Sequence, residues 1–155
     1  MDEAEVWLPV PSKPGVMASS FGRVLLPERT VLMPNGGVRL YKTSPTLGHR
    51  TKVNKNARHE YMNVCNKTLG NLKVHKLVCE AFNGPPPDKK SVVIHKNECG
   101  TDNRPNNLKW GTQKENMNMP KFIEYCRART GENSPVIKHK RKVDNAQKQT
   151  EGTKP

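Results

Sequence analysis

The alternation of apolar and polar residues is clearest in the middle of the chain, where it predicts a strand, a polar loop, a second strand and a helix. A β-branched run that ends at His95 indicates the first strand, and apolar Leu108 lies in the second. Thr112 and Glu115 then form the capping-box pattern of a helix start, in which Thr caps a backbone N–H and Glu reaches back. We expect the strands at 92–96 and 107–111 and the helix from about residue 113.

Similar signals precede and follow this segment. Asn35 and the two glycines after it lie between two apolar runs, which is typical of a hairpin turn. A second pair of runs, at 61–64 and 72–75, alternates as paired strands do. Apolar residues then recur at helix spacing until the prolines at 85–87 end the helix, and Pro120 begins another short one. Helices and strands mixed in this way predict an α+β fold.

The small amount of apolar material limits the core. The chain has 155 residues, of which 33% are hydrophobic and 5% aromatic, with 13 prolines and 11 glycines. This composition suits one small domain with an appended module and a tail, part of it extended or disordered. No run approaches the ~20 apolar residues of a membrane span, and the acidic first residues lack a hydrophobic signal segment. We therefore expect no membrane partner.

The charge of the chain indicates a polyanionic partner. The formal net charge is +13 and the pI is about 9.8. Lys and Arg side chains release condensed counterions from phosphates, so a positive charge of this size favours a nucleic acid. The four cysteines form no CxxC pair, which argues against a structural zinc site and favours reduced thiols. We expect a cytoplasmic protein that binds nucleic acid.

His95 falls at the end of the first central strand, Asn107 at the start of the second, and Asn116 in the first turns of the helix. This order resembles the HNH endonuclease family, in particular its phage and homing-endonuclease branch with a terminal Asn. The resemblance implies a ββα-metal (His-Me) finger with its core at 92–119, inside a nuclease domain at 59–130. It also implies a metal-dependent endonuclease that hydrolyses phosphodiester bonds in double-stranded DNA. The sequence does not determine the oligomeric state, and we expect a monomer.

The resemblance assigns the roles within the finger. His95 is the general base for the attacking water, a task suited to a side chain that titrates near neutral pH. Asn107 orients His95 through its side-chain oxygen. Asn116 is a ligand of the catalytic cation, Mg²⁺ or Mn²⁺, which acts as a Lewis acid. The predicted catalytic set is therefore His95, Asn107 and Asn116, and the predicted metal ligands are Asn116 and Asp102.

One position departs from the family pattern. The residue before the base is usually Asp or Asn, the second protein ligand of the metal, and here it is Ile94. Asp102, Glu98 or Asn97 in the adjoining loop could replace that ligand. The alternative is a catalytically weakened or inactive DNA-binding protein on the HNH scaffold.

The two ends of the chain extend this picture. Six residues match the small module that often precedes HNH nucleases in mobile genes: Glu5, Trp7, Ser20, Gly22, Arg23 and Val24. We therefore expect a small β-rich N-terminal module with a basic linker at 1–58. Residues 131–155 are polar and basic, and we expect them to form a disordered tail that adds non-specific DNA affinity.

Basic side chains outside the catalytic set are candidates for DNA contact. Residues 42–58 carry several Lys, Arg and His with almost no acid, as expected of a loop that follows a phosphate backbone. We interpret His75, which lies outside the finger, as structural or phosphate-contacting rather than as a second catalytic histidine. The predicted DNA contacts are Arg23, Lys52, Lys55, Arg58, His75, Arg104, Lys114, Arg127 and Arg129.

Overall fold

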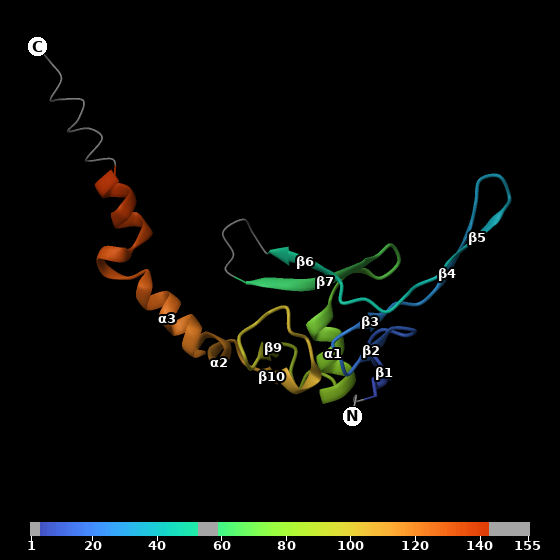
Figure 1. Ribbon diagram of the computed structural model, residues 1–155, viewed down its shortest axis with the longest axis horizontal. Helices are drawn as coiled ribbons and strands as arrows, with labels where there is room; N and C mark the ends of the chain where they lie inside the picture. Colours follow the sequence, from blue (N-terminus) through green and yellow to red (C-terminus); the bar gives the residue numbers. More distant parts are fainter. Residues whose placement is uncertain (1–3, 53–58, 143–155) are drawn as a thin grey trace, which may run out of the picture. The chain divides into compact units, whose positions relative to one another are not determined.

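The computed structural model describes residues 4–52 and 59–142, which belong to two compact units, Met1–Asn116 and Met117–Pro155 (Figure 1). The strands are β1 (Trp7–Pro9), β2 (Met17–Ser19), β3 (Val24–Leu25), β4 (Arg29–Leu32), β5 (Val38–Tyr41), β6 (His49–Lys52), β7 (Glu60–Asn66), β8 (Gly70–Lys73), β9 (Val92–His95) and β10 (Leu108–Gly111). The helices are α1 (Val74–Asn83), α2 (Gln113–Met117) and α3 (Pro120–Ala128), with 3₁₀ turns η1 (Pro105–Asn107) and η2 (Gly131–Asn133). The α+β prediction is confirmed.

The sheets are built from strands that are neighbours in the chain and run antiparallel. β1–β2–β3 and β6–β7–β8 are three-stranded, while β4–β5 and β9–β10 are hairpins. In the turn between β4 and β5, Gly36 has φ +80° and Met33 N donates to Gly37 O at 2.7 Å. Between β7 and β8, Asn66 Oδ1 accepts a hydrogen bond from Thr68 N at 2.8 Å. Local turn chemistry therefore forms both of the predicted outer hairpins. The strand predicted at 72–75 ends at Lys73, because Val74 and His75 form the first turn of α1.

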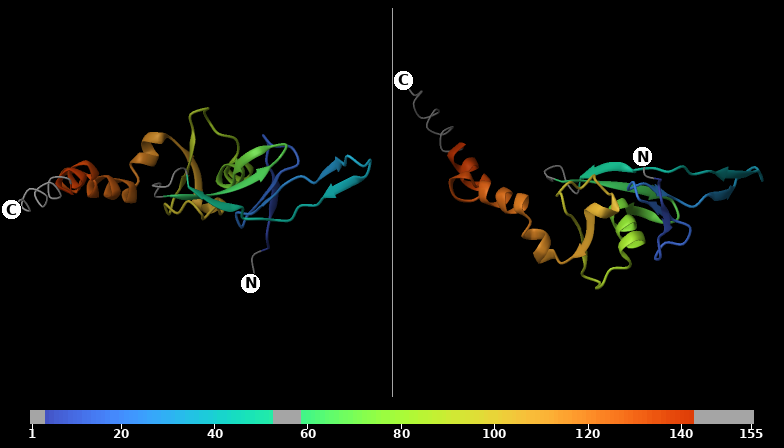
Figure 2. Two further views of the ribbon diagram at one scale, coloured as in Figure 1. Left: turned by 90° about the horizontal axis from the view of Figure 1, so that it is seen from above. Right: turned by 60° about the horizontal axis from the view of Figure 1, so that its bottom comes forward.

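The central hairpin and its helix form where the sequence predicts them. β9 pairs with β10 so that His95 lies opposite Leu108, and both strands lie against α1 (Figure 2). Leu108 is 1% exposed and belongs to the hydrophobic core. Thr112 Oγ1 accepts a hydrogen bond from Glu115 N at 3.1 Å and caps the first turn of α2. The strand–loop–strand–helix prediction is confirmed.

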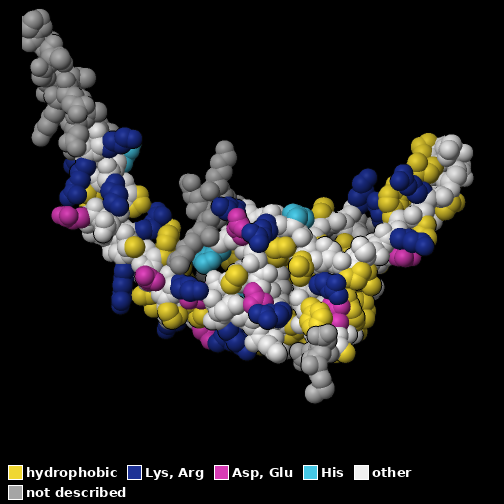
Figure 3. Space-filling view, viewed as in Figure 1, with side chains coloured by type: hydrophobic (Ala, Val, Ile, Leu, Met, Phe, Trp, Pro, Cys, Tyr) yellow, Lys and Arg dark blue, Asp and Glu magenta, His cyan; other side chains and the backbone are white. Residues whose placement is uncertain are grey.

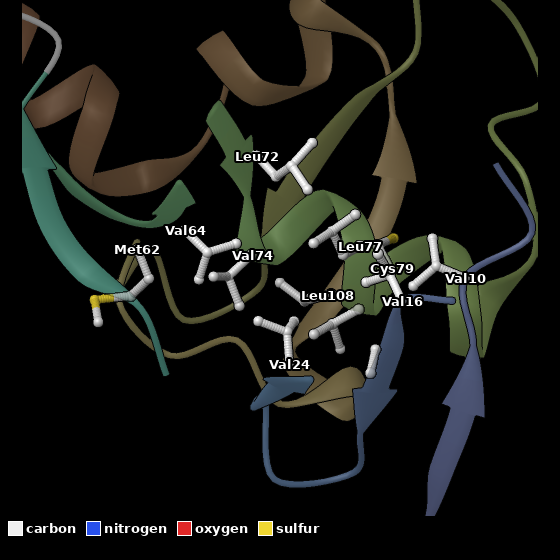
Figure 4. Packing of buried hydrophobic residues seen from close by; sticks show 12 residues of the cluster. Val10, Val16, Val24, Met62, Val64, Leu72, Val74, Leu77, Cys79 and Leu108 are labelled. Atoms are coloured by element: carbon white, nitrogen blue, oxygen red, sulfur yellow. The ribbon is translucent and has the colours of Figure 1, made fainter. Parts of the chain in front are cut away.

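The hydrophobic core joins the N-terminal module to the finger. Helix α1 buries Leu77 and Val78, which are 4% and 0% exposed. In Figure 4, side chains of the N-terminal module point into the same cluster as Leu77 and Leu108. The members from the module are Val10, Val16, Ala18 and Val24. Because burial of one such valine or leucine is worth about 1.5–3 kcal/mol, the shared cluster favours folding of the module and the finger as one unit.

The second unit differs from the disordered tail that the sequence suggested. A 3₁₀ turn at Gly131–Asn133 follows α3, and residues 135–142 are helical. Lys138 N donates to Ser134 O at 3.0 Å, so this helix starts just before a proline, whose φ is pre-set for a first helical turn. Lys and Arg also have good helix propensity. Residues 143–155 lie outside the described residues. Among the helices that the structure describes, none is long and apolar enough to cross a membrane.

Candidate active site

His95 ends strand β9 and is surrounded by three separate parts of the first unit. Its Nε2 atom lies 3.1 Å from Oδ1 of Asn103, in the loop between β9 and β10. Its ring centroid lies 5.3 Å from that of His75 in α1, edge-on, and 6.1 Å from that of Tyr61 in β7. Only 8% of His95 is exposed. A loop, a helix and a strand therefore define the position of one imidazole.

The hydrogen bond to Asn103 determines which ring nitrogen of His95 carries a proton. An amide oxygen can only accept, so Nε2 carries the proton and Nδ1 keeps its lone pair. Burial lowers the pKa of His95 below its usual value, and the bond to Asn103 and the charge of Asp102 oppose that effect. The ring is thus neutral at neutral pH, so it can accept a proton through Nδ1.

His75 is part of this site, although the sequence places it outside the finger. It is 5% exposed, and its ring centroid lies 5.2 Å from that of Tyr61. Burial, followed by the nearby His95, lowers the pKa of His75 to about 3, so the ring is neutral. A buried neutral ring offers no surface or charge to a phosphate. The DNA contact predicted for His75 is therefore not supported, and the structural interpretation is favoured.

Asn107 holds the loop and does not orient the base. Its Oδ1 accepts a hydrogen bond from Asn97 N at 3.0 Å, and its Nδ2 donates to Asn97 Oδ1 at 2.9 Å and to Asp102 O at 2.8 Å. Asn107 lies in η1, at the neck of the loop, so its amide reaches across to the opposite side. The structure corrects the predicted role: Asn103, not Asn107, bonds to the His95 ring.

Asn103 is the site residue that sequence reasoning missed. It is 3% exposed, and its Nδ2 atom has no hydrogen-bond partner among the described residues. The loop at 97–107 contains four asparagines, and asparagine is common in turns. Local sequence carries no signal that singles out the one facing His95, because that choice depends on how the loop folds back over β9.

The oxygen donors that the sequence predicts as metal ligands fit a divalent cation only in part. Nε and Nη2 of Arg104 donate to the two carboxylate oxygens of Asp102 at 2.9 and 2.8 Å, and these bonds lower the pKa of Asp102 to about 2. Arg104 therefore neutralises the carboxylate that a cation would use. Asn116, half-buried in α2, offers an amide oxygen, whereas Ile94 is 1% exposed and offers none. Within 4–52 and 59–142, no three His, Cys, Asp or Glu side chains gather as a metal site.

A polar hollow borders the loop. Its walls come from the turn after β2 and from the loop between β9 and β10: Ser20, Phe21, Asn97, Asp102, Arg104, Asn106 and Asn107. Guanidinium and amide groups of this kind bind phosphate oxygens. The hollow places the N-terminal module at the edge of the candidate site.

Besides Arg104, which is bound to Asp102, two more of the predicted DNA contacts are paired within the first unit. Arg23 donates two hydrogen bonds to the carboxylate of Glu5 in the N-terminal module. Lys52, on β6, lies 3.7 Å from Glu60 on the neighbouring strand. Both pairs are partly exposed, so each basic group still faces solvent on one side.

The remaining described candidates are Lys114 in the first unit and Arg127 and Arg129 in the second. Arg129 stacks over the ring of Tyr125 within the second unit, 5.1 Å from its centroid. Figure 3 shows Lys and Arg side chains spread over the visible face of the first unit rather than gathered in one patch. Lys114 and Arg127 are exposed, and Lys55 and Arg58 lie outside the described residues.

Comparison with known proteins gives two matches. Residues 72–118 match the model of the HNH endonuclease family. A solved structure of the HNH homing endonuclease I-HmuI, reported for its DNA binding and cleavage, is similar to this chain, with 20% sequence identity and a TM-score of 0.44. The similarity covers 80% of this chain and 67% of that one. Among curated protein sequences, none matches this chain significantly.

The matched segment contains the residues that surround His95, apart from Tyr61. It runs from β8 through α1 and the central hairpin to the end of α2. His75, His95 and Asn103 all lie in it, as do Asn107 and Asn116. The resemblance to the HNH endonuclease family is confirmed, and residues 72–118 of this chain carry its motif.

Proposed function

We propose that this protein is a metal-dependent DNA endonuclease of the homing type. It hydrolyses phosphodiester bonds in double-stranded DNA, with His95 as the general base. One observation carries the proposal: within the family-matched segment, Nε2 of the buried His95 ring lies 3.1 Å from the side-chain oxygen of Asn103, an arrangement that favours the Nε2–H tautomer with Nδ1 as the basic nitrogen. The net charge of +13 supports a polyanionic substrate.

The residues of the site support a simple course for the reaction. Nδ1 of His95 takes a proton from water while the water oxygen attacks phosphorus and the bond to the 3′ oxygen breaks. The leaving 3′ oxygen then takes a proton from solvent water and becomes a hydroxyl. The imidazolium that results keeps its Nε2–H bond to Asn103, which favours the charged ring. His75 and Tyr61 pack against the His95 ring and shield it from bulk water, which preserves its neutral form before the reaction.

A hard divalent cation, Mg²⁺ or Mn²⁺, would neutralise charge on the phosphate and on the leaving oxygen. We propose Asn116 as a protein ligand, with Asp102 as the second oxygen donor. Asp102 can serve only if Arg104 leaves it, for example to bind a phosphate oxygen of the DNA. This exchange would make the metal site depend on the substrate.

The second candidate function is DNA binding with little or no cleavage. Ile94 favours it, because this residue fills the position of the usual metal ligand and is 1% exposed. A Cβ added at Gly111 would lie 2.5 Å from Ile94 Cδ1, so the Ile94 side chain packs tightly against β10. With Asp102 held by Arg104 as well, the site has few oxygens left for a cation.

A plasmid assay separates the two functions. The full chain is incubated with supercoiled plasmid in Mg²⁺ or Mn²⁺, with and without EDTA, beside a His95→Ala control. Nicked or linear product that needs the metal and His95 supports the endonuclease. An unchanged plasmid, together with a gel shift of the same DNA, supports the binding protein. Cleavage that survives His95→Ala removes His95 as the base.

A further inference from the structure

We infer that Asn103 is a positioning residue for His95, and that the N-terminal module holds Asn103 in place through Gly22. The inference rests on the proposed function, since it explains how the proposed base is oriented. It makes the N-terminal module a structural part of the active site as well as a potential DNA contact.

The contact between Asn103 and His95 is buried on both sides. The two residues are 3% and 8% exposed, and Oδ1 lies 3.1 Å from Nε2. The amide nitrogen of Asn103 is buried without a described partner, which costs free energy. An apolar side chain at position 103 would avoid that cost. We therefore attribute the amide at this position to its hydrogen bond with the His95 imidazole.

The backbone around Asn103 is held from two directions. Asn107 Nδ2 donates to the carbonyl oxygen of Asp102 at 2.8 Å, just before Asn103. On the other side, Gly22 has φ +76°, and a Cβ at this position would lie 2.8 Å from the carbonyl carbon of Asn103 and 3.1 Å from Arg104 N. The backbone of the N-terminal turn therefore rests directly on the backbone of Asn103.

The turn that carries Gly22 is itself well held. Ser19 is fully buried, and its Oγ accepts hydrogen bonds from Phe21 N at 3.3 Å and Arg23 N at 3.0 Å. Gly22 N donates to Ser19 O at 3.0 Å, and Arg23 is bound to Glu5. These internal bonds hold the turn in place. Because the turn contacts the backbone of Asn103, it also holds the side chain of Asn103 against the His95 ring.

The first test uses two matched glycine substitutions. Gly22→Ala and Gly70→Ala place a side chain at similar left-handed positions, φ +76° and +74°, and so carry similar backbone strain. A Cβ at Gly70 meets nothing within 4 Å, whereas one at Gly22 meets the Asn103 backbone. We expect Gly22→Ala to lower kcat by about tenfold or more with KM little changed, and Gly70→Ala to resemble the wild type. Equal effects of the two variants would overturn the role of the N-terminal turn.

The second test changes Asn103 itself. Asn103→Asp keeps an acceptor for Nε2–H and adds a negative charge, so it should retain activity and move the acid limb of the pH–rate profile upward by about one unit. Asn103→Leu removes the acceptor, and we expect it to lower kcat by about 100-fold. The titratable groups around His95 are Asp102 in the loop, His59 and Tyr61 on the β7 side, and His75 in α1. None of them is altered, so the shift reports on Asn103.

Imidazole ¹⁵N NMR of the free protein gives a readout that needs no cleavage. In the wild type we expect His95 to be protonated at Nε2 and not at Nδ1 near pH 7. Asn103→Asp should keep this tautomer, and Asn103→Leu should lose the preference. The positioning role is overturned if Asn103→Leu leaves both the tautomer and the pH profile as in the wild type. If the NMR result is as expected but no variant cleaves DNA, the positioning stands and the proposed endonuclease fails.

Discussion

The carboxylate of Glu80, on helix α1, accepts hydrogen bonds from both Ser12 N at 2.7 Å and Ser12 Oγ at 2.8 Å. The two residues are 68 positions apart. Glu80 is 9% exposed, so this polar link lies at the junction of the N-terminal module and the finger. Together with the shared apolar cluster, it explains why the first unit runs from the first residues to Asn116.

Removal of the Glu80 carboxylate should loosen this junction. Glu80→Ala leaves Ser12 N without an acceptor, so we expect it to destabilise the protein by about 1–3 kcal/mol. Urea unfolding at neutral pH measures the change. A double-mutant cycle with Ser12→Ala tests only the hydroxyl part of the link and should give a coupling energy of about 1 kcal/mol. Additive effects would mean that the hydroxyl contributes nothing.

Substitutions of the two neighbouring histidines, His95 and His75, should have different effects on the cleavage rate. If His95 is the base, His95→Ala should reduce the cleavage rate by about 10²- to 10⁴-fold, the usual contribution of a general base. His75→Phe keeps an aromatic ring against Tyr61 and His95, so we expect most of the activity to remain. Plasmid nicking under single-turnover conditions checks both variants. A larger loss in His75→Phe than in His95→Ala would reverse the assignment.

Stability should fall in mild acid because His75 is buried as the neutral form. Its pKa is about 3 in the folded protein, compared with roughly 6.5 when unfolded. The unfolded chain therefore binds the extra proton between these values. The contribution of neutral His75 to the free energy of unfolding is fully present above pH ~6.5. It decreases by up to about 1.4 kcal/mol per pH unit as pH falls toward 3. His75→Phe should flatten this part of the stability–pH curve, as measured by urea unfolding from pH 7 to 4.

Replacement of Ile94 tests the missing metal ligand. Ile94→Asp puts a carboxylate beside the base, so we expect cleavage at lower metal concentration and a faster rate. The side chain is almost fully buried against β10, so the charge should cost about 2 kcal/mol or more of stability, which Mg²⁺ should partly restore. Ile94→Thr is the control, because it is polar but lacks the carboxylate. If Ile94→Asp stays folded with metal dependence and rate unchanged, position 94 does not face the cation.

The basic C-terminal segment should contribute non-specific DNA affinity. Residues 138–142 contain Lys138, Lys140, Arg141 and Lys142, all exposed. Truncation after Thr130 removes these four and two further lysines of the sequence, so it should weaken binding to all sequences alike and reduce the slope of log K against log salt by up to about five. Fluorescence anisotropy with two unrelated duplexes at several salt concentrations measures it. An unchanged slope would remove this segment from the interface.

The local structure followed from the sequence, because the signals for it are short-range. The β-branched run before His95, the Thr112 cap and the glycines near Asn35 each act within a few residues. These interactions determined the central hairpin, the outer hairpins and α1, and they also indicated which histidine ends β9. The order of these elements was enough to identify the HNH resemblance.

The tertiary structure decided how the base is held. Asn103 reaches His95, His75 packs edge-on against it, and Gly22 supports the loop from a distant part of the chain. Each of these contacts depends on the closure of a loop or the packing of separate elements, and no periodicity or spacing encodes such a contact. The family resemblance had assigned the orienting role to Asn107. Both asparagines suit a turn, and only the folded loop determines which side chain faces the imidazole.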